Sequence, residues 1–377
     1  MTLEIVPAEG SAALRRFIGL PWRLYQPGRD RWIPPLRVMV RDLLDARRNP
    51  FYENAERALF LALEDGVPVG RIAAIQNRSH NTHHRDRVGF FGFYESVDDA
   101  RVAHALFEAA ATWLRGRGLT AMRGPMNPSM NHECGLLVRG FRFDPFILTP
   151  WNPRFYTTLF EGAGLTPEKD LLAYYIPADP KRFQLPEGAR QAAGRARTRL
   201  GRLIFRDLDA RRLQREAEVC RLIYNEAWTG NWGFVPMTEA EFAYMARQLR
   251  PLLLPQFSFI AEVDGHPAGF LVLLPDFNQL FKLVPSGRLL PTGFFTMLRG
   301  KRRLRTGRVI LLGIRDQYRG QGILPLFLHE LLRRARAYGG VAAEASWVLE
   351  DNKALNAPLR ALGARVTKRW RIYSREL

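Results

Sequence analysis

The sequence predicts an α/β protein made of two tandem domains, each a mixed, mostly antiparallel β-sheet flanked by helices. Three observations predict this fold. The chain has 377 residues, which is too long for one ordinary domain. Its composition, 47% hydrophobic and 25% charged residues, is that of a folded protein rather than a disordered one. One set of strand and helix patterns also occurs twice along the chain, in the same order.

The clearest repeated element is a β-hairpin. Residues 65–70 read DGVPVG, and residues 264–269 read DGHPAG. An Asp-Gly pair favours a tight turn, and the apolar runs on either side of it favour half-buried strands. Both copies are therefore expected to pair two strands across this turn.

Two further matches follow each hairpin. Residues 87–93 match 308–314, and residues 152–164 match 352–363. The first match is an apolar strand that leads into a pattern typical of an amphipathic helix, over 99–116 and 322–337. The order of elements predicts a first domain at 1–185 and a second at 186–377. A segment rich in Pro and Arg, 178–200, is expected to connect them.

Several classes of protein are excluded by what the sequence lacks. No apolar run reaches the roughly 20 residues that span a bilayer, and the first residues do not resemble a signal peptide. Two cysteines, Cys134 and Cys220, are too few for a disulfide scaffold. His80, His83, His84 and Asp86 are interpreted as exposed loop residues, and no metal is predicted. We expect a cytoplasmic protein, either free or peripheral at the inner face of the membrane.

The charge is strongly positive. Lys and Arg number 56 against 37 Asp and Glu, a formal net charge of +19. Such a field favours anionic partners, namely nucleic acid, an anionic membrane surface, or phosphate-bearing cofactors and carrier proteins. The alternative is a solvated surface that uses Arg for solubility. The cations are spread along the chain without a known nucleic-acid module, so nucleic acid is the least favoured partner.

The second domain carries a glycine loop between a strand and a helix, Asp316-Gln317-Tyr318-Arg319-Gly320-Gln321-Gly322-Ile323. The glycines remove side chains that would block close approach, so that successive N–H groups can converge on a phosphate. The helix that starts near Gly322 adds its positive dipole end. The first domain has Glu95-Ser96-Val97-Asp98-Asp99 at this place, whose carboxylates would repel a phosphate.

This loop resembles the acyl-coenzyme A (acyl-CoA) pyrophosphate loop of the GNAT superfamily of N-acyltransferases, Gln/Arg-x-x-Gly-x-Gly/Ala. Arg319, Gly320 and Gly322 fit that pattern, whereas Leu324 stands at its last place. The resemblance implies two tandem GNAT-like domains, of which only the second binds acyl-CoA. The cofactor-binding residues it implies are Leu312, Gly313, Ile314, Arg319, Gly320, Gln321, Gly322, Ile323 and Asn352. The family's usual tyrosine, which protonates the leaving thiolate, is replaced by Leu359.

Over nearly its full length the chain resembles one bacterial subgroup of tandem GNAT proteins that includes ceramide synthase-like members. The segments that carry this likeness are 124–137, 231–234, 274–278 and 346–352. The resemblance implies transfer of an acyl group from acyl-CoA, or from an acyl carrier protein, to an amine. A long-chain sphingoid-type base is the amine that the subgroup implies.

Acyl transfer to an amine needs a polarised thioester carbonyl and a base that removes a proton from the amine. Backbone N–H groups near Leu312–Ile314 are expected to polarise the carbonyl. The candidates for the base, in order, are Glu344, Glu226, Glu350 and Asp276. Glu344 ranks first because period-two alternation places it on one strand face with Ser346.

A second group of polar residues is expected to line a substrate cleft between the domains: Asn127, Asn131, Glu133, Asn231 and Trp232. Cys134 near His132 is the pattern of a nucleophile and its base, but no third residue to orient the histidine is evident. Residues 289–308 join an apolar half to a cluster of arginines. This segment fits a membrane surface or an acyl carrier protein, or else a basic loop packed on its domain.

The leading hypothesis is therefore an N-acyltransferase. A non-catalytic acyl-CoA sensor is the alternative that Leu359 and the altered first copy leave open. A basic nucleic-acid-binding protein is the third hypothesis.

Overall fold

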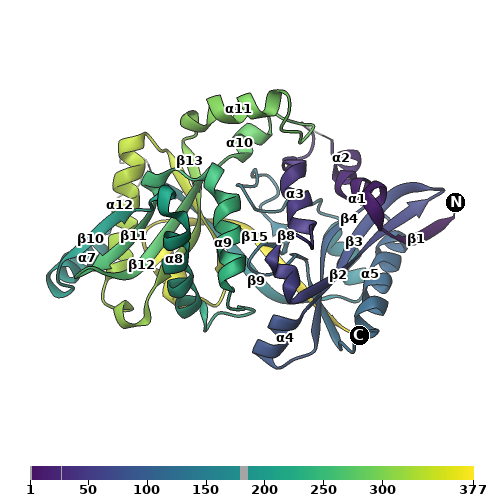
Figure 1. The fold of residues 1–377 in the computed structure, drawn as a ribbon, viewed down its shortest axis with the longest axis horizontal. Coiled ribbons are helices and arrows are strands. Elements are labelled where there is room, and N and C mark those ends of the chain that lie inside the picture. The colour runs from purple at the N-terminus through teal and green to yellow at the C-terminus, as the bar shows by residue number, and fades with distance from the viewer. Residues whose placement is uncertain (1, 27, 179–185) are drawn as a thin grey trace. The chain divides into compact units, whose positions relative to one another are not determined.

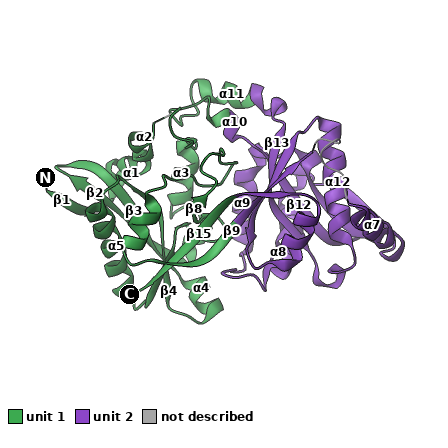
Figure 2. Cartoon of the chain, turned by 180° about the vertical axis from the view of Figure 1, so that it is seen from behind, with its two compact units in different colours: residues 1–171, 280–298, 368–377 green, residues 172–279, 299–367 purple. Residues whose placement is uncertain are grey.

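The structure, a computed structural model, describes residues 2–26, 28–178 and 186–377, which form two compact units. Unit 1 takes in residues 1–171, 280–298 and 368–377, and unit 2 takes in residues 172–279 and 299–367 (Figure 2). The predicted boundary between 185 and 186 borders residues 179–185, which lie outside the described residues. Each unit has the predicted α/β architecture, a mixed sheet with helices packed on it.

The sheet of unit 1 has the strand order β1-β2-β3-β4-β5-β15. The strands are β1 (Leu3–Pro7), β2 (Ala55–Glu64), β3 (Val67–Asn77), β4 (Val88–Ser96), β5 (Ala121–Gly124) and β15 (Arg365–Glu376). Neighbouring strands are antiparallel except β4 and β5, which are parallel. Strand β8 (Leu136–Arg139) also pairs with β15, and β6 (Met126–Asn127) pairs with β7 (Glu133–Cys134). The helices are α1 (Gly10–Gly19), α2 (Pro21–Leu24), α3 (Arg37–Leu44), α4 (Arg78–His84), α5 (Ala100–Arg115) and α6 (Tyr156–Gly162).

The sheet of unit 2 has the order β9-β14-β13-β12-β11-β10. The strands are β9 (Thr166–Pro177), β10 (Leu203–Asp207), β11 (Ser258–Val263), β12 (His266–Pro275), β13 (Thr306–Ile314) and β14 (Ala342–Leu349). Strands β10 to β13 are antiparallel, and β13 and β14 are parallel. The helices are α7 (Glu187–Arg199), α8 (Leu213–Trp228), α9 (Glu239–Leu249), α12 (Ile323–Tyr338) and α13 (Lys353–Ala361) (Figure 1). Two short helices, α10 (Asn278–Phe281) and α11 (Thr292–Gly300), lie between β12 and β13 in the sequence.

Each sheet is completed by a strand from the other half of the sequence. β15 follows the helices of unit 2, yet its residues Tyr373–Glu376 pair with β5 of unit 1. β9 follows the helices of unit 1, yet residues 172–177 belong to unit 2, where β9 is the neighbour of β14. A division of the chain into two sequence halves, as the repeat predicts, therefore does not describe either sheet.

The hairpin repeat is confirmed down to an irregularity of the backbone. The β2–β3 ladder shifts register between Ala62 and Leu63, and the β11–β12 ladder shifts between Ala261 and Glu262, the same place 199 residues later. The predicted match of residues 87–93 to 308–314 does not agree with the strand pairing. Strand pairing puts Phe90 of β4 where unit 2 has Arg308, an offset of 218 residues, whereas the sequence match gave 221. Apolar strands resemble one another at several registers, so that sequence similarity alone does not fix their pairing.

The cores lie beneath the two helices that the sequence predicts at 99–116 and 322–337, which are α5 and α12. α5 buries the stripe Leu106, Phe107, Ala110 and Leu114 against the sheet of unit 1. α12 buries Ile323, Phe327 and Leu331 against unit 2, together with Ala193 and Ala196 of α7. Part of the predicted 178–200 connection is thus a packed helix. Among the described residues, no helix has the length and apolar character that a membrane crossing requires.

In unit 1 the chain itself fills the space beside β4. The β4–β5 ladder ends at the pair Phe90 and Arg123, after which residues 125–127 pass over β4. The Asn127 side chain accepts a hydrogen bond from the Phe93 N–H, with 2.6 Å between Oδ1 and N. The passage needs glycine at position 92, because a Cβ there would lie 1.7 Å from the Met126 carbonyl oxygen.

We therefore expect Gly92→Ala to lower the free energy of unfolding by at least about 3 kcal/mol, the upper range of overpacking. Urea-induced unfolding followed by tryptophan fluorescence measures it. Gly116→Ala is the matched control, since its added Cβ meets its nearest neighbour at 3.5 Å. A Gly92→Ala protein as stable as this control would contradict the close approach of residues 125–127.

Candidate functional site

The candidate site of unit 2 begins where two parallel strands part. β13 and β14 pair at only four positions, from Thr306 with Ala342 to Val309 with Ala345. Both strands then continue, β13 to Ile314 and β14 to Leu349, but within the described chain their ladder goes no further. The β12–β13 ladder also shifts register there, which leaves Ile310 as an extra residue. Alternate N–H groups of residues 310–314 consequently point toward the gap between the strands.

The glycine loop lies at the end of β13, as predicted. A 3₁₀ turn over Asp316–Tyr318 precedes Gly320 and Gly322, whose φ angles are +73° and +84°. Gly322 is the N-cap of α12 and gives that helix no side-chain cap. Leu324, the residue that departs from the family pattern, packs with the core of unit 2 rather than in the loop. The loop thus presents backbone N–H groups and a helix N-terminus, which together suit an anion.

The glycine loop is held against the end of α8. The Glu226 carboxylate of α8 accepts hydrogen bonds from Arg315 Nε at 2.9 Å and from the Asp316 N–H at 2.7 Å. Arg319 donates to the carbonyl oxygen of Ala227 and forms an ion pair with Asp316 at 3.0 Å. Two residues predicted for chemistry, Glu226 as a base and Arg319 as a phosphate ligand, therefore also position the loop.

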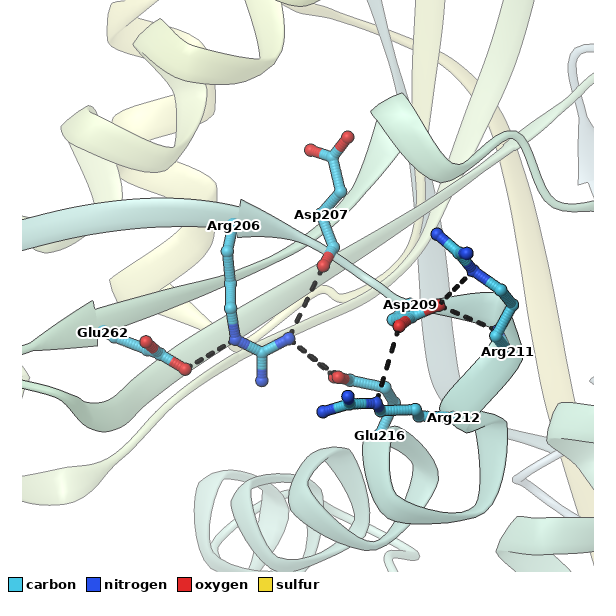
Figure 3. A network of polar contacts seen from close by, with 7 residues as sticks. All are labelled: Arg206, Asp207, Asp209, Arg211, Arg212, Glu216 and Glu262. Atoms are coloured by element: carbon cyan, nitrogen blue, oxygen red, sulfur yellow. Dashed lines mark hydrogen bonds and ion pairs between the residues drawn. The ribbon is translucent and has the colours of Figure 1, made fainter.

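Helix α8 is itself fixed to the edge of the sheet by Arg206 of β10 (Figure 3). Its guanidinium lies between Glu262 of β11, at 2.6 Å, and Glu216 of α8, at 2.8 Å. Both carboxylates are largely buried, so the pairing satisfies charges that would otherwise be costly to keep from water. These two ion pairs fix the position of α8. Helix α8 in turn holds Glu226 against the glycine loop.

A buried polar trio lies just before the two strands part. Arg308 of β13 stands opposite Glu344 of β14, and both contact Ser346. The Ser346 hydroxyl donates to Glu344 Oε1 at 3.0 Å and accepts from Arg308 Nε at 2.8 Å. Their exposed fractions are 0% for Glu344, 3% for Arg308 and 4% for Ser346. The predicted shared face of Glu344 and Ser346 is confirmed, whereas Arg308, which we grouped with surface arginines, is buried.

The polar trio is not required by the fold. The ladders of unit 1 put Phe90, Arg123 and Pro125 where unit 2 has Arg308, Glu344 and Ser346. A sheet of the same topology thus forms with no carboxylate at this place. Since a buried charge costs free energy unless it is well paired, the trio is better explained by function than by stability.

The other candidate bases lie elsewhere in unit 2. Asp276 is buried directly after β12, where its N–H donates to the Thr306 carbonyl at 2.9 Å and Gln279 lies 3.5 Å from its carboxylate. Glu350 is exposed at the end of β14. Asn352 caps α13, its Oδ1 accepting from the Leu355 N–H at 3.1 Å, and Leu359 is buried in the core.

Unit 1 replaces the glycine loop with a carboxylate of its own. Glu95 lies in β4, not at the helix N-terminus as we expected, and it accepts hydrogen bonds from the hydroxyls of Tyr25 and Tyr156. Arg71 approaches its other oxygen at 3.6 Å. Burial raises the pKa of the Glu95 carboxyl, although Arg71 and the two tyrosines favour the charged form. Asp99 caps α5 by accepting from the Arg101 N–H. At the place that corresponds to the glycine loop, unit 1 thus has no glycine, and the helix that follows, α5, is capped.

The residues predicted to bind the substrate fall in both units. Asn127 and Glu133 belong to the β6–β7 ladder of unit 1, and Asn131 lies in the turn that joins these strands. Asn231 and Trp232 follow α8 in unit 2, where the Asn231 N–H donates to the Trp228 carbonyl. The His132 ring contacts Ser129, with 2.9 Å between Nδ1 and Oγ. Cys134 itself is buried.

The histidines of unit 1 are not the exposed loop that we expected. His80, His83 and His84 lie on α4, and His80 is buried, with its Nε2 3.2 Å from Asp86. Burial lowers the pKa of His80 to about 4, although Asp86 beside it raises the pKa. No group of three or more His, Cys, Asp or Glu in the described ranges is arranged to hold a metal ion.

Comparison with known proteins identifies relatives of the whole chain. The model of the "Acetyltransferase (GNAT) family" matches residues 218–363. A Caulobacter vibrioides protein named "Bacterial ceramide synthase" is 36% identical over 383 residues, which cover 100% of this chain and 98% of the relative. "Protein YghO" of Escherichia coli is 34% identical and covers 97% of this chain and 93% of its own.

Two solved structures share the fold at low sequence identity. A "Tandem GNAT protein from the clavulanic acid biosynthesis pathway" superposes with a TM-score of 0.57 at 13% identity, over 100% of this chain and 98% of the other. An N-acetyltransferase of Sphaerobacter thermophilus gives 0.51 at 16% identity, over 99% and 95%. Both likenesses concern the fold alone.

Proposed function

The chain belongs to the GNAT superfamily of N-acyltransferases, and on that premise we propose that it transfers a long acyl group from acyl-CoA to the amine of a sphingoid-type base. One observation carries the proposal. Parted parallel strands, a glycine loop and an uncapped helix occur together in unit 2, whereas unit 1 fills or caps each counterpart. The amine is proposed from the name of the Caulobacter vibrioides relative, "Bacterial ceramide synthase".

The residues present fit an acyl-CoA donor. The N–H groups of Gly320 to Ile323 would hold the pyrophosphate. The space beside Gly320 is open, and the dipole of α12 favours negative charge. Gly322 itself lies against α7, since a Cβ there would come within 2.9 Å of the Ala192 carbonyl oxygen. The thioester would lie in the gap between β13 and β14. There the N–H groups of residues 310–314 would stabilise the negative charge that develops on its carbonyl oxygen.

Glu344 is the base we assign to this reaction. The amine nitrogen attacks the thioester carbon, and its proton passes through the Ser346 hydroxyl to Glu344. Arg308 orients Ser346 through the bond to Oγ and a second bond, at 3.2 Å, to the Ser346 carbonyl. The C–S bond then breaks, and the amide and a thiolate leave. Because Leu359 stands at the usual tyrosine place, the thiolate takes its proton from water, and Glu344 returns the proton of the amine to solvent.

An apolar cavity of about 40 Å³ in unit 2 is where we propose that a short part of the acyl chain lies. It lies beneath the second half of α12, and its lining includes Leu328, Leu331 and Ala335 of that helix with Gly307 and Ala343 of the sheet. The same strand, β13, borders the cavity at its first residues and the gap at its last, so the two lie along one line of the sheet. Aliphatic carbon is the chemistry that such a lining accepts.

Binding of the donor is tested by thermal stabilisation. Coenzyme A and palmitoyl-CoA should stabilise the protein by about 2.7 kcal/mol at 100 times Kd. Arg319→Glu should abolish this shift, because it puts a carboxylate beside the phosphates. Arg211→Glu, at a side chain 94% exposed, is the matched charge reversal and should keep it. A shift that survives in Arg319→Glu would refute the glycine loop as the site. Absence of any shift would refute free acyl-CoA as donor and leave an acyl carrier protein.

Catalysis is tested by Glu344→Gln, which keeps an acceptor for Ser346 but removes the base. We expect kcat to fall about 10²–10⁴-fold, the usual contribution of a general base, while stabilisation by palmitoyl-CoA is kept. Thiol release coupled to amide formation measures it, with Glu376→Gln, at an exposed carboxylate of β15, as the control. An unchanged kcat would assign the base elsewhere, and Asp276→Asn would follow. Donor binding in the wild type without thiol release for any amine would indicate a sensor instead.

Chain length is tested by Ala335→Phe, which fills the cavity from a partly buried position on α12. We expect the ratio of kcat/KM for palmitoyl-CoA over hexanoyl-CoA to fall at least tenfold. Ala337→Phe, at an exposed position two residues along the same helix, should leave this ratio unchanged. Equal ratios in the two variants would place the acyl chain outside this cavity.

A further inference from the structure

The connection between β12 and β13 exposes an unusual concentration of apolar side chains. Residues 276–305 make this connection, whereas residues 78–87 suffice between β3 and β4. Eleven large apolar side chains of the described chain are exposed, and five of them lie within residues 283–298. They are Leu283, Leu290, Phe294, Phe295 and Leu298, with exposed fractions from 47% to 71%. Hydrophobic residues gathered in this way mark a surface that contacts something other than water.

The start of this segment is anchored to unit 1, so its exposure is not that of a loose loop. The Trp22 indole donates to the Pro285 carbonyl at 2.9 Å, and the Arg37 N–H donates to the Gly287 carbonyl at 2.8 Å. Lys282 pairs with Asp144. The buried side of α11 packs on the start of the segment at Gly293, where a Cβ would lie 2.6 Å from the Arg288 carbonyl oxygen.

The exposed side of α11 is apolar over most of its length and basic at its C-terminal end. Phe294 and Leu298 lie four residues apart on α11 and form one exposed stripe, and Leu290 is exposed just before the helix begins. Cations follow at the C-terminal end, where Arg299 lies in the last turn of the helix and Lys301–Arg303 continue it as a 3₁₀ turn. The sequence contains no Asp or Glu from residue 277 to residue 315. In the described chain, the exposed side chains of Arg302 and Arg303 form no ion pair with a carboxylate.

We propose that the α11 segment, residues 283–303, docks on an anionic lipid bilayer. Its apolar stripe would enter the boundary between headgroups and acyl chains, and its arginines would contact the negative headgroups. The absence of carboxylates across the segment is the complementarity that such a surface requires. Exposed Phe and Leu favour a bilayer over an acidic carrier protein, since a carrier's charged surface would leave this stripe in water. The inference does not depend on the proposed acyl transfer.

Co-sedimentation of the full chain with vesicles, without donor or amine, tests this surface. Vesicles of phosphatidylcholine with 30% phosphatidylserine should bind the wild type, and phosphatidylcholine alone should bind it at least tenfold more weakly. Arg302→Gln with Arg303→Gln should lower partitioning to anionic vesicles about 25-fold, since each cation near the surface contributes about fivefold. Added salt should weaken the wild type toward the same level. Arg211→Gln with Arg212→Gln, also exposed, is the matched control and should bind as the wild type does.

The apolar half of the surface is tested separately. Phe294→Ser with Leu298→Ser should reduce partitioning at least tenfold, while Val67→Ser with Ile204→Ser, at exposed apolar positions elsewhere, should not. Thermal midpoints within about 2 °C of the wild type would confirm that the two α11 variants and their two control variants are folded.

Three outcomes would overturn the proposal: equal binding to neutral and anionic vesicles, no loss in either α11 variant, or capture of an acidic acyl carrier protein with no binding to vesicles. None of them bears on acyl transfer, which is measured with soluble substrates.

Discussion

The parting of β13 and β14 after four residue pairs is the constraint on which the rest of the chain depends. Backbone N–H groups inside a sheet must find acceptors, and strands that separate leave this need unmet unless something enters the gap. Unit 1 meets it with its own chain, since Asn127 reaches back to the Phe93 N–H. Among the described residues of unit 2, none is recorded bonding across the matching place as Asn127 does, and this gap is where we propose the thioester binds. One topology thus supports a closed copy and an open one.

The surroundings of the gap show how the open copy keeps its geometry. Glu226 and Ala227 at the end of α8 hold the glycine loop, and Arg206 holds α8 through Glu216. Just before the strands part, Ser346 joins Arg308 to Glu344 within the sheet. Charged groups are costly to bury, and they are tolerated here because each has a fixed partner. A site built this way holds its reacting groups on strands and helices rather than on loops.

The sequence alone predicted the α/β class, the hairpins at residues 65–70 and 264–269, and the helix after the glycine loop, because each rests on local turn chemistry or helical periodicity. It could not predict pairing between distant segments. The match of 87–93 to 308–314 was three residues out of register, and Arg308 was grouped with a cluster of surface arginines. Glu344 and Ser346 were found from alternation within one strand. Their third partner lies on another strand, 36 residues earlier than Glu344, and no local pattern announces such a neighbour.

The exchange of β9 and β15 affects whether either repeated half of the gene can be lost. An ancestral gene that duplicated would at first encode two copies, each able to fold and to be lost without the other. Once the final strand of the second copy pairs with β5 of the first, deletion of either copy removes a strand from both sheets. The copy that has filled its own gap therefore cannot be discarded, even though it holds no glycine loop. Its surface residues are free to diverge, but it must remain in one chain with the other copy.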